Sequence, residues 1–530
     1  MVVDALAEVA RWYRKEQQSV APASIDEANA TSSTLPCCPS TSINRMLSTP
    51  PVRAFLEHKV ESVRQALQRD HNNHILHASL ALFLELLNGT DPRVLHHMAE
   101  AIALAPSKGA YKAHRTRIQF NSTAAQKRAF LASSVAATST EPWSRTMLPV
   151  PVEYPSSLSV DTFMTKYAGA GQPVLIKGGA SLVMNASWSL ESLVANPVVA
   201  NTMVDTKRKV ADSVRWARLE DGPRQSVGSF IQAMQRDDWS AEPPLYIHDV
   251  SIPLHFPGTW PHHAPLLTCL LVELTPQVTI PAYFARDYLQ QTPEGTMYRE
   301  TWPSLFVGPR GSESATHVDS FGSNFWMALV QGRKRWRLVH PNDMHLLYPT
   351  WHAGSADVVY GVDLASTDES KGDSLYPLFR HARVWECVLE AGDILFVPAG
   401  TPHFVQNLEH TVAVSSNYID ATNWTQASSA LKHQAYSDPR AAELLLHLQH
   451  VEAHRLPSDE SSAQVLPPPS ISFQEFKHPQ IHVRSVRVAS PPASPAHDHH
   501  TSKRLRSAYA DLVADLASPS SSEGDDAVPG

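Results

Sequence analysis

The chain has 530 residues, of which 43% are hydrophobic, and its 44 Lys and Arg against 52 Asp and Glu give a formal net charge of −8. This length supports one large core with a smaller domain beside it, and the acidic balance gives no support to a nucleic-acid partner. No apolar run reaches the roughly 18 residues of a membrane-spanning helix, and the four scattered cysteines exclude a disulfide framework and favour a location in the reducing cytoplasm or nucleus.

The first part of the chain is predicted to be flexible and then helical. Residues 1–50 begin without the apolar core of a secretory signal and soon become rich in Ser, Thr, Ala and Pro, which predicts a flexible segment. Residues 51–125 carry apolar side chains at helical spacing, and a Gly-Thr-Asp-Pro break at 89–92 predicts helix, turn, helix. This region resembles a tetratricopeptide hairpin. It would serve either as a partner-binding arm or as a helical cap packed on the rest of the chain.

Several histidines fall within this helical region. Neither thiolates nor carboxylates accompany them at a regular zinc spacing. They are therefore predicted to be scattered surface residues rather than a metal site: His71, His74, His77, His96 and His97.

From about residue 150 to 425 the sequence consists of short β-rich runs, and one run places a lysine on an apolar face. Alternate residues of a strand share a face, so in GRKRWRLVHP one face takes Lys334, Trp336 and Leu338 and reads as core. The other face is expected to be basic and solvated: Arg333, Arg335 and Arg337. A lysine directed into a core needs an anion, because an unpaired buried ammonium costs several kcal/mol or loses its proton.

Residues that precede and follow that strand in the sequence form a candidate metal site. His317 and Asp319 share a face by the same parity, and the 2-His-1-carboxylate facial triad that binds Fe(II) needs a second histidine. His403 follows a tight turn in GDILFVPAGTPHFVQN and opens another β-rich run, which suits that third ligand. An isolated His-x-Asp is most often a surface pair, so the prediction depends on the three residues together.

These motifs, in this order, resemble the Jumonji-C oxygenases. The resemblance lies in HVD, then GRKRW, then GDILFVPAGTPH, and it covers roughly residues 150–425. The segments PLYIHD, VTIPAYFARDYL and NFWMALVQGRKRW are most similar to the branch that contains the Jumonji-C lysyl hydroxylase and reported arginine demethylase. The resemblance implies a mainly β fold, a double-stranded β-helix of the cupin type, with an N-terminal α-helical region and C-terminal helices around it.

The resemblance also implies roles for individual residues. His317, Asp319 and His403 would bind Fe(II), and Lys334 would bind the distal carboxylate of 2-oxoglutarate, with O2 as the second cosubstrate. Further cosubstrate contacts would come from the hydroxyl groups of Tyr246, Ser415 and Ser314, while Asn407 and Asn417 match in position only. Met327 departs from the family pattern, which has an asparagine there, and so removes one hydrogen bond to the cosubstrate.

The activity implied is hydroxylation of a protein side chain, with lysyl hydroxylation favoured. N-methyl demethylation by the same site is the first alternative, and a non-catalytic cupin-like scaffold is an alternative of another class. Hydroxylation of a nucleic-acid base finds no support in the charge balance.

The C-terminal part is predicted to be helical and then disordered. Residues 426–456 should form a helical pair around a break at Asp438-Pro439, and the apolar face of AAELLLHLQHV could serve a homodimer. Residues 457–530, rich in Ser and Pro, are predicted to form a disordered tail. Within that tail SKRLRSAYADLVADLA is a candidate nuclear address.

Overall fold

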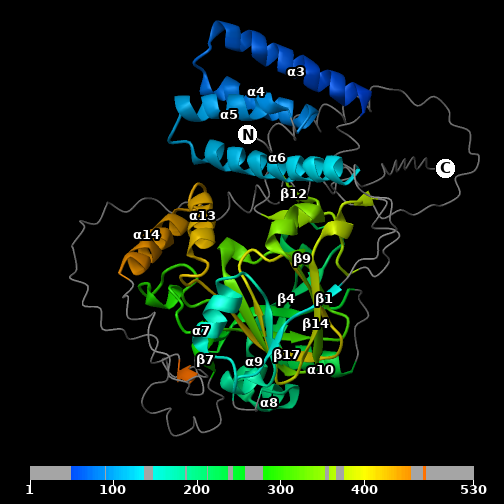
Figure 1. The fold of residues 1–530 in the computed structure, drawn as a ribbon, viewed down its shortest axis with the longest axis vertical. Coiled ribbons are helices and arrows are strands. Elements are labelled where there is room, and N and C mark those ends of the chain that lie inside the picture. The colour runs from blue at the N-terminus through cyan, green and yellow to red at the C-terminus, as the bar shows by residue number, and fades with distance from the viewer. Residues whose placement is uncertain are drawn as a thin grey trace, which may run out of the picture. The chain divides into compact units, whose positions relative to one another are not determined.

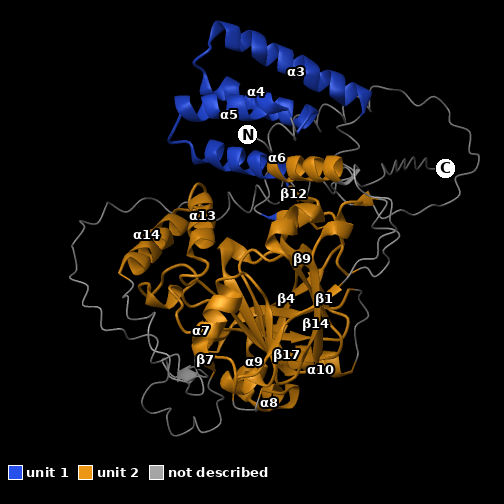
Figure 2. Ribbon diagram, viewed as in Figure 1, with its two compact units in different colours: residues 1–122, 351–357, 485–530 blue, residues 123–350, 358–484 orange. Residues whose placement is uncertain are grey.

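The computed structural model describes residues 49–89, 91–136, 147–184, 188–211, 213–236, 243–256, 278–352, 357–365, 375–454 and 470–472. The chain divides into two compact units: residues 1–122, 351–357 and 485–530 form unit 1, and residues 123–350 and 358–484 form unit 2 (Figure 2). The predicted N-terminal flexible segment lies outside the described residues except for residues 49 and 50, and the predicted tail does so except for 470–472. The candidate nuclear address also lies outside the described residues.

Unit 1 is built from helices. They are α3 (Pro50–Arg69), α4 (His74–Leu87), α5 (Pro92–Leu104) and the first part of α6 (Gly109–Ala136). The side chains of Asn73 and Asp91 cap α4 and α5 by accepting hydrogen bonds from backbone N–H groups of the first turn. Their apolar faces share one core, which includes Leu56, Leu80, Phe83, Val94, Met98 and Ile118.

Two features of this region differ from the sequence expectation. Helix α6 continues to Ala136 rather than ending near residue 125, because neither Gly nor Pro interrupts the sequence after Gly109. The prediction of scattered surface histidines is wrong for one pair, since Nδ1 of His77 lies 3.2 Å from Nδ1 of His97. Burial between α4 and α5 lowers the pKa of His97 to about 4.

The core of unit 2 consists of two facing sheets. One has the strand order β1-β14-β11-β16-β9, from Met147–Pro149, Val384–Glu390, Arg333–Val339, His403–Asn407 and Glu313–His317. The other has the order β2-β3-β15-β10-β17-β8-β6, from Val152–Glu153, Val174–Ile176, Ile394–Val397, Asn324–Gln331, Thr411–Tyr418, Ser304–Gly308 and Ile247–Ser251. Strands far apart in the sequence alternate between the sheets, and the predicted double-stranded β-helix is confirmed.

Alternation along the strands fills the space between the sheets. In β10 the side chains of Phe325, Met327 and Leu329 point inward, whereas Trp326 and Ala328 point outward. From the opposite sheet, inward-facing side chains complete the inner core: Trp336, Leu338, Trp385, Leu389 and Val405. Both faces of β10 are therefore buried, which explains its continuous apolar sequence.

Helices cover the outer face of the seven-stranded sheet. They are α8 (Leu190–Ala195), α9 (Pro197–Asn201) and α10 (Val227–Gln235), which gather at one end of unit 2 (Figure 1). Short helices α7 (Val160–Thr162) and α11 (Ile252–His255) join the strands. The hairpin of β4 (Met203–Lys209) and β5 (Leu219–Ser226) projects beside the barrel.

The expectation of a solvated arginine face on β11 is wrong at Arg337. Arg333 is exposed, but Arg337 is buried, and its guanidinium donates to the carbonyl of Leu364 at 2.6 Å and lies 3.4 Å from Glu386. Residues 344–348 and 358–365, the latter including β13 (Val358–Tyr360), supply side chains that cover this end of the sheet. Strand β13 pairs with β12 (Pro349–Trp351). The alternation of side chains along the strand correctly predicted the face on which Arg337 lies. It could not show which segment covers that face.

The C-terminal helices pack on unit 2 through their apolar faces. Helices α13 (Trp424–Gln434) and α14 (Pro439–Ala453) are separated by the predicted break, where Asp438 caps α14. Leu444, Leu445 and Leu448 lie in a core shared with other parts of the same unit, whereas Leu446 is exposed. Most of the face considered for a homodimer is therefore already buried within the chain.

Two further observations concern the predicted tail and membrane segments. Residues Ser470–Ser472 form strand β18, paired antiparallel with β7 (Thr279–Pro281), so the prediction of disorder is wrong for these three residues. The free backbone groups of a short edge strand explain that pairing. Among the helices that the structure describes, none is long and apolar enough to cross a bilayer.

We predict that Gly332→Ala is much more destabilising than Gly311→Ala. Both glycines have positive φ, 82° and 86°, which costs an alanine about 1–2 kcal/mol. Only at Gly332 does a Cβ meet another group, the carbonyl oxygen of His410 at 2.2 Å, and this clash should add about 1–3 kcal/mol. Urea unfolding of the two variants measures the difference. Equal losses of stability would contradict the packing of the turn that leads into β11.

Candidate active site

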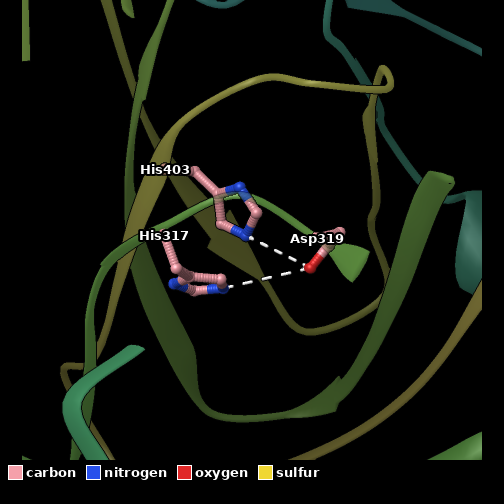
Figure 3. Close-up of side chains that lie close together, drawn as sticks. All are labelled: His317, Asp319 and His403. Carbon is pink, nitrogen blue, oxygen red and sulfur yellow. Dashed lines mark ion pairs between the residues drawn. The ribbon is translucent and has the colours of Figure 1, made fainter. Parts of the chain in front are cut away.

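Three side chains converge at one end of the barrel. His317 is the last residue of β9, Asp319 follows two residues later, and His403 opens β16, where it pairs directly with His317. Asp319 Oδ1 lies 4.0 Å from His317 Nε2 and 3.9 Å from His403 Nε2 (Figure 3). Among the residues that the structure describes, no other group of three or more His, Cys, Asp and Glu gathers its ligand atoms in this way.

Backbone carbonyl groups fix the orientation of both imidazoles. His317 Nδ1 lies 2.7 Å from the carbonyl oxygen of Ala315, and His403 Nδ1 lies 2.9 Å from that of Thr401. Each Nδ1 must carry a proton to donate to a carbonyl, which leaves the Nε2 lone pair free and directed at Asp319. This is the tautomer that metal-binding histidines adopt.

The electrostatics of the three residues suit a cation. Burial lowers the pKa of His317 well below its ordinary value, with a further contribution from neighbouring His403, so the imidazole is neutral. Limited hydration raises the pKa of Asp319, and a bound cation would reverse that shift. The three ligand atoms lie within 4.8 Å of one another, close enough to hold one metal ion.

A cavity of about 140 Å³ adjoins these three residues. Half of the residues that line it are aromatic or apolar: Trp216, Tyr246, Trp302, Phe306, Phe325, Met327, Trp336 and Val405. The other half are polar: His248, Asp249, Ser314, His317, Asp319, Ser320, His403 and Asn417. Small-molecule sites combine apolar walls with polar groups that set the orientation of the ligand.

Lys334 lies inward on β11, as predicted, and is fully buried. Its Nζ donates to the hydroxyl group of Tyr246 at 2.9 Å and to Oδ1 of Asn407 at 2.7 Å, but meets no carboxylate of the described residues there. Burial therefore lowers the pKa of Lys334 to about 7. Of these three residues only Tyr246 lines the cavity, so its hydroxyl group connects the cavity to the ammonium.

Gly308 makes this arrangement possible. A Cβ at Gly308 would lie 2.2 Å from Asn407 Nδ2 and 2.6 Å from Cε2 of Tyr246. Both partners of Lys334 thus pack directly against a backbone that has no side chain, and a larger residue would displace them.

The remaining predicted residues occupy different positions around the cavity. Ser314 lines it, and so does the buried, apolar side chain of Met327. Ser415 pairs with Met327 across β10 and β17 and so faces inward, but it does not line the cavity. Its Oγ is fully buried and makes no hydrogen bond to the described residues, which is a costly state that a polar ligand would relieve. Asn417 lines the cavity and donates to Ser323 Oγ at 2.8 Å.

Sequence reasoning missed several side chains in the cavity wall. The ring of Trp216 packs edge-on against His317, 4.3 Å between centroids, and its Nε1 donates to the carbonyl of Val318 at 2.9 Å. His248 and Asp249 lie within the PLYIHD segment, which singled out only Tyr246. No sequence signal connects Trp216 to the site, because the hairpin that carries it is about a hundred residues away along the chain.

Comparison with known proteins identifies the family. A family model described as a cupin-like domain matches residues 160–423. Relatives include the arginine-specific demethylase JMJ20 of Arabidopsis thaliana, 27% identical over 285 residues that make up 50% of this chain and 56% of the relative. The 2-oxoglutarate and iron-dependent oxygenase JMJD4 of Danio rerio is 34% identical over 144 residues, 27% of this chain and 32% of the relative.

A third relative links two activities in its name. The bifunctional arginine demethylase and lysyl-hydroxylase psr-1 of Caenorhabditis elegans is 30% identical over 152 residues, 28% of this chain and 37% of the relative. The chain therefore belongs to the cupin-like family, in its Jumonji-C branch, as the motifs predicted. It spans about half the length of the first relatives it matches.

We predict that the triad binds one divalent metal ion per chain. His403→Ala should weaken Mn(II) binding at least about 100-fold, because a facial triad with one ligand missing loses its geometry. His410→Ala is the matched control, since His410 lies in the turn after the same strand and its Nδ1 accepts from the Arg310 N–H, away from the cavity. Calorimetric titration measures both variants. Stoichiometric metal uptake by the triple variant His317→Ala, Asp319→Ala, His403→Ala would contradict the assignment.

Proposed function

We propose that this chain is an Fe(II)- and 2-oxoglutarate-dependent dioxygenase that hydroxylates a protein side chain. The observation that carries the proposal is the pairing of two histidines and a carboxylate at one end of the barrel with a buried lysine at the other, which meets no carboxylate of the described residues. The names of the relatives, which include a 2-oxoglutarate and iron-dependent oxygenase, support the same class of enzyme.

The residues present fit both cofactors. His317, Asp319 and His403 would hold Fe(II), and the protein would leave the remaining coordination positions free for the keto acid end of 2-oxoglutarate and for O2. A bound iron would provide the centre at which O2 is reduced, with two electrons from the oxidation of 2-oxoglutarate to succinate and CO2 and two from the substrate C–H bond, so that one oxygen atom enters succinate and the other the hydroxylated product.

Strand geometry sets the distance between the two ends of the site. Every second residue of β16 points into the barrel, namely His403, Val405 and Asn407. Lys334 pairs opposite Asn407. At about 3.3 Å per residue, the backbone positions of His403 and Asn407 lie about 13 Å apart. The long side chain of Lys334 spans part of that distance, and a five-carbon dicarboxylate fits the rest.

Each polar group has a defined task in this proposal. Lys334 and the Tyr246 hydroxyl group would bind the far carboxylate, and Ser415 and Ser314 would donate further hydrogen bonds. The apolar side chains of Met327, Phe325 and Val405 would exclude water from the cosubstrate. Met327 also removes one hydrogen bond that an asparagine would make.

Lysyl hydroxylation is the favoured reaction, and N-methyl demethylation by the same site is the alternative. Hydroxylation of an N-methyl carbon gives a product that loses formaldehyde, so the two outcomes differ only in which C–H bond approaches the iron. A non-catalytic scaffold would have no use for the buried Lys334 and Ser415, which are destabilising without a ligand.

The direct test is turnover by the full chain with Fe(II), 2-oxoglutarate and O2. We expect succinate release that requires all three, together with peptides from a cell extract that gain the mass of one oxygen atom. Loss of a methyl group with formaldehyde release would select demethylation instead. Succinate release that is no faster than that of the triad triple variant would contradict the proposal.

We predict that Lys334→Met raises the 2-oxoglutarate concentration needed for half-maximal succinate release at least tenfold. A hydrogen bond between ammonium and carboxylate is worth about 1.5–3 kcal/mol, and about 1.4 kcal/mol is tenfold in affinity. Arg333→Met, on the exposed face of the same strand, is the control and should change little. Mn(II) affinity should be unchanged in both variants, and loss of metal binding by Lys334→Met would show that the lysine supports the fold instead.

We predict that cosubstrate binding weakens as the pH rises above about 7. Because burial lowers the pKa of the free Lys334 to about 7, the ammonium is progressively lost above that pH, and a bound carboxylate, which favours the charged form, must take up a proton. Calorimetry of the inert analogue N-oxalylglycine in buffers of different ionisation enthalpy should show this uptake at about pH 8, and Lys334→Met should abolish it. An affinity that is constant from about pH 7 to 9 would rule out the ammonium as a partner.

Partners and location remain part of the proposal. A protein substrate is supported by the activities in the names of the relatives. We also propose a cytoplasmic or nuclear location, on the scarcity of cysteines. A homodimer through the C-terminal helices stays a prediction, with exposed Leu446 as the side chain of α14 that remains available to a second copy.

A further inference from the structure

A β-bulge directs two polar side chains into the cavity wall. Strands β6 and β8 pair Ile247 with Val307 and then Val250 with Leu305, so β6 contains one extra residue over this interval. The extra length falls at His248 and Asp249, and Asp249 has a φ of 55°, which is uncommon for a residue with a side chain. Bulges beside active sites re-aim side chains, and both residues line the cavity.

Asp249 lies in the wall of the same cavity as His317 and Asp319. The residue as a whole is exposed, but burial of its carboxyl group raises the pKa of Asp249. Asp249 Oδ1 accepts a hydrogen bond from Trp302 Nε1 at 3.2 Å, and the hydroxyl group of Ser304 also bonds to this carboxylate. A carboxylate can accept about four hydrogen bonds, so Asp249 keeps the capacity to accept from a cation. Trp302 and Trp216 both line the cavity, so the carboxylate has aromatic neighbours in its wall.

The charged side chains that line the cavity are acidic rather than basic. Among the described residues that line it, none is Lys or Arg, and the carboxylates are Asp249 and Asp319. Burial lowers the pKa of His248 to about 3, so that imidazole is neutral as well. The charges of a divalent ion, Asp319, a bound dicarboxylate and the Lys334 ammonium would cancel, so an ionised Asp249 would supply the negative charge that remains in the loaded site.

We propose that Asp249 is the specificity-determining residue of this site, and that it pairs with an ammonium or guanidinium group on the side chain that enters the cavity. This inference rests on the proposed function, and it selects a cationic substrate side chain over a neutral or acidic one. A charge-assisted hydrogen bond inside a partly desolvated cavity is stronger than a neutral one, and the aromatic rings nearby would add cation–π attraction.

The alternative is a purely structural role, in which Asp249 only anchors Trp302 and the bulge. Asp249→Asn separates the two roles. Asparagine keeps an oxygen that can accept from Trp302 and tolerates positive φ better than most residues, so it removes the charge alone. Asp363→Asn is the matched control, because exposed Asp363 likewise accepts a hydrogen bond, here from the backbone N–H of Ala365, and does not line the cavity.

The test uses the full chain loaded with Mn(II) and N-oxalylglycine, and compares n-butylammonium with n-butanol by ligand-observed NMR titration at about pH 8. An alkylammonium is charged there, since its reference pKa is about 10.4. We expect the wild type and Asp363→Asn to bind n-butylammonium at least tenfold more tightly than n-butanol. Asp249→Asn should reduce that ratio to about one while it keeps its Mn(II) affinity.

Each outcome bears on the inference. A wild type without the preference overturns it, as does Asp249→Asn that folds and retains the preference. Should Asp249→Asn fail to fold, n-butyrate serves as a second probe of the wild type: it should bind more weakly than n-butanol, and equal binding overturns the inference. Turnover of 2-oxoglutarate without the cation preference defeats only this inference, whereas the preference without turnover supports the cation site and contradicts the proposed function.

Discussion

The pairing register of β9, β16 and β11 is the constraint on which the whole site depends. It places His403 opposite His317 at one end of β16 and Asn407 opposite Lys334 at the other, all on the inner face of the barrel. A slip of one residue would turn every one of these side chains to the opposite face. The inner core between the two sheets, including Trp336 and Val405, makes such a slip costly and thereby holds both ends of the site.

The same geometry leaves three polar groups without the partners that would stabilise them. The ammonium of Lys334 is fully buried and meets no carboxylate of the described residues, and the Ser415 hydroxyl group makes no hydrogen bond to them. The Asp319 carboxyl has a raised pKa. Groups of this kind cost about 1–3 kcal/mol each. A metal ion and a dicarboxylate would satisfy all three together, so ligand binding and folding stability are coupled in this protein.

Much of the site could be predicted because strands have a side-chain period of two. That period correctly placed Lys334 in the core and directed attention to His317, Asp319 and His403, whereas resemblance to a family was needed for Tyr246 and Ser415. The sequence could not show which parts of the chain pack against one another in the folded protein. Examples are the segment that buries Arg337, the contact between His77 and His97, and the packing of Trp216 against His317. The bulge that presents Asp249 is equally invisible, since it exists only in the pairing of β6 with β8.

Anomalous X-ray diffraction from crystals grown with Mn(II) and N-oxalylglycine tests the central claim most directly. The account predicts one manganese peak bonded to His317 Nε2, Asp319 Oδ1 and His403 Nε2, with the far carboxylate of the analogue in hydrogen-bond contact with Lys334 Nζ and the Tyr246 hydroxyl group. Manganese bound elsewhere, or an analogue whose far carboxylate points away from Lys334, would contradict it.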